Sequence, residues 1–171
     1  MVTLTEIVPF AQAVRGNVAN VIVGKAGAVD LLLVALLWVV FFLNQGNRQI
    51  YSTVLPQIKA AVPQGGLGLT DVQAGVVATV FVAVYGICVP LAGFLGDILR
   101  RKRQILFSVF LFSAGTLLTG FGGGLWAMIL FYGILFGGGE ALYYPPATSL
   151  MGQFHENSRA TALSIHQTAL Y

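Results

Sequence analysis

The loop after the second long apolar stretch decides the fold of this chain. It reads Gly93-Phe94-Leu95-Gly96-Asp97-Ile98-Leu99-Arg100-Arg101-Lys102-Arg103. Four basic residues stand together here, although only 9% of all residues are charged and 57% are apolar. An ordinary soluble domain has roughly 25% charged residues. The composition therefore excludes a soluble enzyme, a nucleic-acid module and a disordered segment, and it indicates that the loop borders a membrane.

The stretches around this loop are long enough to form membrane helices. A helix needs about 20 apolar residues to cross a hydrocarbon core about 30 Å thick. Uncharged runs of 17, 25 and 36 residues cover 31–47, 72–96 and 104–139, and glycines divide the last run near residue 122. We predict an all-α, multi-pass membrane protein. Four complete spans are expected at about 30–58, 71–95, 104–120 and 125–153, and a fifth, truncated span at 160–171.

The basic residues predict the orientation of these spans. Apart from Arg48 and Lys59, every Lys and Arg lies in residues 1–28, at 100–103 or at 159. Loops rich in Lys and Arg stay on the cytoplasmic side. We therefore expect a multi-pass protein of the cell membrane with a cytoplasmic amino terminus. Residues 1–28 are predicted to be a cytoplasmic leader, either a helix on the membrane surface or an irregular segment.

The 93–103 loop resembles the signature loop of the major facilitator superfamily, roughly G-x-L-[AG]-D-R-x-G-R-[KR]. The matching residues are Gly93, Leu95, Gly96, Asp97, Arg101 and Lys102, whereas Ile98 and Arg100 depart from the pattern. The resemblance implies that this is part of the first six-helix half of a transporter with twelve spans. It also implies a conformational latch formed by Gly93, Gly96, Asp97, Arg101 and Lys102.

Span 1 carries polar residues within an apolar helix. Asn44, Arg48 and Tyr51 share one helical face. One interpretation ends the span at Leu43 and leaves Arg48 at the membrane interface. The other, which we favour, extends the span through Pro56 and directs Arg48 into a cavity, because the residues beyond it are again apolar.

Span 4 carries a lone carboxyl group. Glu140 has about fifteen uncharged residues on either side, and an acidic group at such depth is costly unless it is protonated or paired. A proton-binding role is one interpretation, and a structural hydrogen bond to a neighbouring helix is the other. Tyr143 and Tyr144 follow on the same span and are candidates for substrate contact.

Both segments resemble the anion:cation symporter and spinster-like branches of the superfamily. Residues 44–56 are similar to the span 1 pattern N-Y-x-D-R…LP, and residues 139–145 to the span 4 pattern G-E-A…P. The resemblance implies substrate binding by Arg48 with Asn44, Asn47 and Tyr51, and proton coupling by Glu140. Asn47 replaces the Asp of the pattern, so coupling is expected through Glu140 alone, through His166 in span 5, or not at all.

A count of residues places Arg48 and Glu140 apart. With span 1 starting at Asp30, Arg48 lies about 27 Å from the cytoplasmic edge, and with span 4 starting at Leu125, Glu140 lies about 22 Å from the opposite edge, at 1.5 Å per residue. In a core about 30 Å thick, the two side chains then differ in depth by roughly 19 Å. We therefore expect two points along one pathway rather than a direct pair.

These patterns predict the amino-terminal portion of a secondary transporter for a small organic anion, such as a carboxylate or sugar acid, with proton coupling. The expected partners are the lipid bilayer, the anionic substrate, protons and the remainder of the transporter, without nucleic acid. The alternatives are a spinster-like transporter of lipid or amphipathic molecules and a truncated, non-transporting membrane protein. The sequence predicts no enzyme, because it lacks G-x-S-x-G and HExxH motifs. With one cysteine and no cofactor motif, it also predicts no metal site and no cofactor.

The orientation can be tested with single cysteines. In a Cys88→Ala background, cysteines at Gln64 and Lys102 should react with a membrane-impermeant reagent from opposite sides, because basic loops stay inside. Gln64 should be labelled in intact cells and Lys102 only in inverted vesicles. Labelling of both in intact cells would contradict the predicted topology.

Overall fold

The computed structural model describes residues 4–156 and 158–170, and it describes their side chains from residue 28 onward except that of Asp97. Within these residues the fold consists of helices without strands. Four segments are long and apolar enough to cross a membrane: Ala28–Lys59, Asp71–Gly96, Arg101–Gly120 and Leu125–Phe154. The predicted all-α fold with four complete spans is thereby confirmed.

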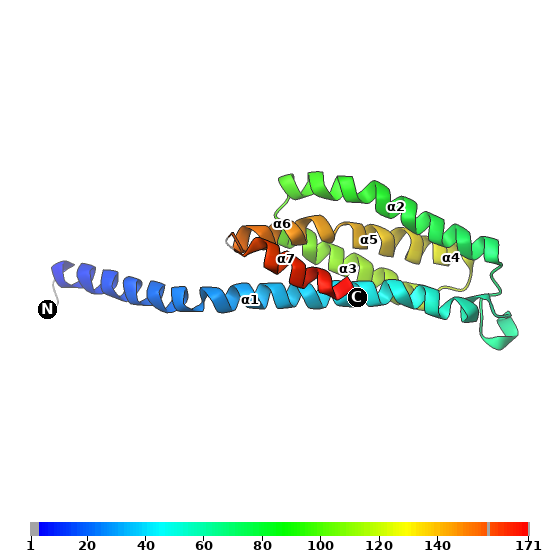
Figure 1. Cartoon of the computed structure of the whole chain (residues 1–171), viewed down its shortest axis with the longest axis horizontal. Coiled ribbons are helices and arrows are strands. Elements are labelled where there is room, and N and C mark those ends of the chain that lie inside the picture. Colours follow the sequence, from blue (N-terminus) through cyan, green and yellow to red (C-terminus); the bar gives the residue numbers. More distant parts are fainter. Residues whose placement is uncertain (1–3, 157, 171) are drawn as a thin grey trace.

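The first span belongs to a single long helix. Helix α1 runs from Leu4 to Lys59, and its amino-terminal part extends past the other helices (Figure 1). At 1.5 Å per residue its length is about 84 Å, well beyond a hydrocarbon core of about 30 Å. No break separates the predicted leader from span 1, although residues 1–3 lie outside the described residues.

A compact connection joins α1 to helix α2, Asp71–Ile98. It contains a short 3₁₀ turn, Val62–Gln64, and both Gly65 and Gly68 adopt positive φ angles, which residues with side chains disfavour. The Thr70 hydroxyl accepts a hydrogen bond from the Gln73 amide, and the Gln73 side chain accepts one from the Thr70 amide. This reciprocal cap satisfies free N–H groups and defines where α2 begins.

Span 4 is built from several helical segments. They are α4 (Leu125–Met128), the π-helix η2 (Ile129–Phe136), α5 (Gly137–Ala141) and α6 (Tyr144–Phe154). Pro145 and Pro146 stand in the first turn of α6, where the missing N–H groups need no partner. The helix is therefore interrupted at residues 142–143, directly after the predicted functional Glu140.

Helices α2 and α3 (Arg101–Gly120) both pack against η2 and α5, so that span 4 lies inside the bundle. Helix α7 (Arg159–Gln167) and the 3₁₀ turn η3 (Thr168–Leu170) lie beside α1 (Figure 1). Two glycines permit the contact between α3 and span 4. A Cβ atom on Gly115 would lie 2.7 Å from the Phe136 nitrogen, and one on Gly139 would lie 2.5 Å from the Phe112 nitrogen. Small residues take this role in membrane helices because they let backbones approach closely.

We expect Gly139→Ala to destabilise a complete transporter that contains this chain by about 1–3 kcal/mol, the usual effect of overpacking. Gly138→Ala is the matched control, because its nearest contact would be an ordinary 3.7 Å from Val84. Thermal unfolding in detergent measures both variants. Equal unfolding temperatures for the two variants would show that α3 does not depend on Gly139.

Candidate functional site

Arg48 and Glu140 form a direct pair in the interior of the bundle. The Arg48 Nη1 atom donates to Glu140 Oε1 at 3.4 Å. The Glu140 side chain is 5% exposed, and the Arg48 side chain is 41% exposed. The pair thus joins a buried carboxylate to a guanidinium group whose other side remains accessible.

The prediction that the two residues lie about 19 Å apart in depth is wrong. It placed one membrane edge at Asp30 and the opposite edge at Leu125, about 30 Å apart. Helix α1 is longer than such a core, so Asp30 does not mark the edge of span 1. The shared end is marked by Lys59 at the end of α1 and by Leu125 at the start of span 4. Counted from that end at 1.5 Å per residue, Arg48 lies at a depth of about 16 Å and Glu140 at about 22 Å. The long Arg48 side chain covers the difference.

Aromatic rings from α2 complete the surroundings of Arg48. Its guanidinium carbon lies 5.2 Å from the centre of the Phe81 ring and 5.8 Å from that of Tyr85. Both distances allow cation–π attraction, which orients a guanidinium without using its hydrogen-bond donors. Among the described residues Glu140 is its only hydrogen-bond partner, so several N–H groups remain available to an anionic ligand.

The aromatic layer was not predicted from the sequence. Phe81 also contacts Tyr132 and Phe136, with ring centres 5.4 and 5.8 Å apart. The pairs Phe81/Tyr85 and Tyr132/Phe136 each stand at i, i+4, a spacing that places both rings on one helical face. That spacing is the signal that could have revealed the layer.

A mostly apolar cavity of about 320 Å³ lies behind this layer, between α1, α3 and η2. The predicted site residues Asn47 and Tyr51 line it, together with Tyr132 and Phe136. The Tyr51 hydroxyl donates to the Ala74 carbonyl at 2.9 Å, and the Tyr51 ring stacks on Tyr132. Tyr51 therefore presents its ring to the cavity while its hydroxyl binds α2.

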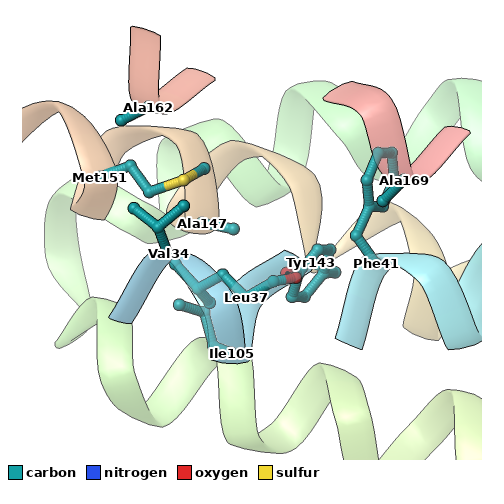
Figure 2. Close-up of a cluster of buried hydrophobic side chains, with 9 residues drawn as sticks. All are labelled: Val34, Leu37, Phe41, Ile105, Tyr143, Ala147, Met151, Ala162 and Ala169. Carbon is teal, nitrogen blue, oxygen red and sulfur yellow. Dashed lines mark hydrogen bonds between the residues drawn. The ribbon is translucent and has the colours of Figure 1, made fainter. Parts of the chain in front are cut away.

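The remaining polar candidates form a second cluster between α1, α6 and α7. The Tyr143 hydroxyl donates to the Leu37 carbonyl at 2.7 Å and lies 3.4 Å from His166 Nε2. His166 is fully buried and stacks on Phe41, with ring centres 4.6 Å apart. Figure 2 shows Tyr143 beside Leu37 and Phe41. Gln167 donates to the Tyr144 hydroxyl. These tyrosines thus pack spans 1, 4 and 5 together.

Most of the predicted latch residues lie near the carboxyl-terminal end of α2, beyond the aromatic layer. Gly93, Gly96 and Arg101 line a small cavity of about 180 Å³ with the prolines of α6. Lys102 is exposed, and the side chain of Asp97 lies outside the described residues. A contact not foreseen from the sequence joins α2 to α3 here, because the buried Gln104 amide donates to the Ala92 carbonyl at 2.8 Å.

In the part of the chain whose side chains are described, no three His, Cys, Asp or Glu residues lie close enough together to hold a metal ion. The polar chemistry of the site therefore centres on one arginine, one carboxyl group and nearby amides and hydroxyls.

Comparison with known proteins identifies the family. The sequence profile of the Major Facilitator Superfamily matches residues 37–171. The chain belongs to this superfamily. Among curated superfamily members it is 32% identical to Protein spinster homolog 1 of Homo sapiens over 152 residues, covering 87% of this chain and 28% of that protein. It is 31% identical to the Sphingosine-1-phosphate transporter SPNS2 of Mus musculus over 131 residues, covering 75% of this chain and 23% of that protein.

The chain thus spans about a quarter of the length of these superfamily relatives. The resemblance to the spinster-like branch, stated from residues 44–56 and 139–145, agrees with these matches. No solved structure gives a significant match to the chain.

Proposed function

We propose that this chain is the amino-terminal portion of a secondary transporter for an organic anion, in which Arg48 binds the anionic group and Glu140 carries the coupled proton. The observation that carries the proposal is the pair between a half-exposed guanidinium and a buried carboxylate. Such transporters hold their substrates near the midplane and move them by alternating access between two halves.

The pair suggests how substrate and proton are coupled. A carboxylate or phosphate that forms two parallel hydrogen bonds with Arg48 would compete with Glu140 for the same guanidinium. Glu140, once released, would be a buried carboxyl group without a cation, which is tolerated in its neutral form. Substrate binding would therefore favour proton uptake, and proton release would restore the pair and displace the substrate.

The apolar cavity supports an amphipathic substrate. Tyr132 and Phe136 line it and contact Phe81, whose ring lies against Arg48. An anionic head group at Arg48 could therefore extend an apolar tail toward Tyr51 and Phe136. Its volume of about 320 Å³ falls at the lower end of the range for small-molecule sites, roughly 300–1,000 Å³. The name of the SPNS2 relative, a sphingosine-1-phosphate transporter, agrees with a lipid-like anion. A small carboxylate or sugar acid is the second candidate. Such a substrate could bind Arg48 through its anionic group without filling the apolar cavity.

The proposal also includes the cellular location and the membrane topology of the protein. Positive charge at residues 100–103 supports a cytoplasmic loop there and a multi-pass protein of the cell membrane with its amino terminus inside. Gly93, Gly96 and Arg101 would then serve the latch on the cytoplasmic side.

We expect Arg48→Lys to weaken binding of the anionic ligand at least about tenfold, equivalent to about 1.4 kcal/mol, because Lys cannot form the planar bidentate contact. Binding of dodecyl phosphate, butyrate and gluconate to a complete transporter containing this chain can be compared by calorimetry. Tight binding of dodecyl phosphate alone would favour the amphipathic substrate. Arg103→Lys, which changes an exposed arginine in the first turn of α3, is the control. Equal affinities in both variants would indicate that Arg48 lies at the membrane interface and does not bind the anion.

We expect Glu140→Gln to abolish accumulation driven by a pH gradient and to spare exchange of substrate, because the amide mimics a permanently protonated carboxyl group. Uptake and exchange in proteoliposomes measure the two activities separately. Accumulation that survives in Glu140→Gln would move the proton site elsewhere, with His166 as the next candidate. Loss of exchange as well would indicate a structural or binding role.

A further inference from the structure

Among the residues whose side chains are described, buried polar atoms of Asn44, Glu140, Gln104 and His166 lack hydrogen-bond partners, and Asn44 and Glu140 stand out because they belong to spans 1 and 4, which the Arg48–Glu140 pair joins. Neither the nitrogen nor the oxygen of the Asn44 amide has one, although Asn44 is 0% exposed. Glu140 Oε2 is likewise buried and unpaired, while its other oxygen accepts from Arg48. Leaving a buried donor or acceptor unpaired costs about 1–3 kcal/mol, so such groups call for an explanation.

The helical wheel of α1 directs Asn44 toward span 4. At about 100° per residue, Asn44 lies within about 40° of Leu37, Arg48 and Tyr51. Each of these contacts span 4: Leu37 through the Tyr143 hydroxyl, Arg48 through Glu140, and Tyr51 through Tyr132. Asn44 is therefore surrounded, on its own helix, by residues that face span 4.

The level of Asn44 along the bundle also matches Glu140. Leu37 lies opposite Tyr143 and Tyr51 lies opposite Tyr132 on the antiparallel span 4. Asn44 stands midway between Leu37 and Tyr51, and the midpoint on span 4 falls within α5, Gly137–Ala141. Three glycines precede Glu140 in this segment and offer no side chain, so Glu140 is the polar group that α5 presents at this level.

We propose that Asn44 is the second partner of Glu140, which binds the carboxyl group in its protonated form after Arg48 has been released to the substrate. This inference rests on the proposed function and assigns to Asn44 the role of positioning the proton carrier rather than contacting the substrate.

The exchange balances without a further reactant. A proton from water in the pathway bonds to one Glu140 oxygen. The resulting O–H group donates to the Asn44 carbonyl oxygen, and the Asn44 NH₂ group donates to the other Glu140 oxygen. When the proton leaves to water on the other side, the carboxylate returns to Arg48. Asn44 keeps its own protons throughout.

The other polar groups on the helices around Glu140 have partners or positions of their own, so Asn44 is the candidate to bind the protonated carboxyl group. Arg48 is the cation from α1, and the Tyr85 ring of α2 lies 5.8 Å from its guanidinium carbon. Tyr132 of η2 stacks on Phe136 of the same span. On the α3 side the Ser108 hydroxyl donates to the Gly139 carbonyl at 2.9 Å and is thereby occupied. On the α7 side, His166 Nε2 lies 3.4 Å from the Tyr143 hydroxyl, which donates to the Leu37 carbonyl.

Infrared difference spectroscopy of a complete transporter containing this chain, reconstituted in lipid and titrated with pH alone, tests the inference without a substrate. The C=O stretching band of protonated Glu140 is identified as the band that Glu140→Gln removes. Asn44→Leu conserves volume and removes the hydrogen-bonding amide, so the band should move to higher wavenumber. Gln45→Leu is the matched control, because it removes an amide about 100° away on the same helix and should leave the band in place.

Each outcome bears on a different claim. A Glu140 band that stays in place in Asn44→Leu overturns the role of Asn44 and leaves the proposed proton carrier intact. If Glu140→Gln removes no band at any pH at which the protein is folded, the carboxyl group stays ionised, and both proposals are wrong. Should Asn44→Leu fail to fold, Asn44→Ser retains a shorter hydrogen-bonding group and should shift the band in the same direction, and an unshifted band in that variant overturns the proposal.

Discussion

The close approach of α3 to span 4 is the constraint on which the rest of the structure depends. It exists because Gly115 and Gly139 have no side chains where a Cβ atom would meet the backbone of the opposite helix. Lipid tails are as apolar as Leu, so burial of apolar surface gives little association between membrane helices, and packing together with hydrogen bonds has to provide it. With α3 in place behind α5, Glu140 is held on the face that meets α1.

The polar groups follow from this arrangement. Arg48 reaches Glu140 across the interface of α1 and span 4, and the rings of Phe81 and Tyr85 hold the guanidinium from the α2 side. Among the described side chains, spans 1, 2 and 4 thus hold one cation and one carboxyl group in an otherwise uncharged layer. Such an ion pair is either intact, or each of its two groups has found another partner, and the proposed function depends on this exchange of partners.

The sequence predicted more of the fold than of the site. Charge-free runs and glycine turns were sufficient to place four spans. A segment that crosses a bilayer must be apolar over the thickness of the core, and its backbone N–H and C=O groups must be hydrogen-bonded within the protein, as they are in a helix. Arg48 and Glu140 were each recognised as costly polar groups within spans, but their pairing was missed because the residue count took Asp30 as the edge of span 1. The aromatic layer around Phe81 was also missed, since its signal in the sequence is only the i, i+4 spacing of the pairs Phe81/Tyr85 and Tyr132/Phe136. The π-helical segment 129–136 has no signature in composition, because it depends on packing against α2 and α3.

That π-helical segment has a consequence for the register of span 4. In η2 each turn contains more residues than in an α-helix, since its hydrogen bonds join residues five apart rather than four. If all eight residues of Ile129–Phe136 adopted α-helical winding instead, everything beyond the segment would turn by roughly 100°, one α-helical residue step, relative to the residues before it. Glu140 would then leave the α1 interface without any substitution at residue 140. The identity of the carboxyl residue and the winding of the segment before it are therefore equally necessary, and a span with Glu140 but eight α-helical residues at 129–136 would have a different protein interior.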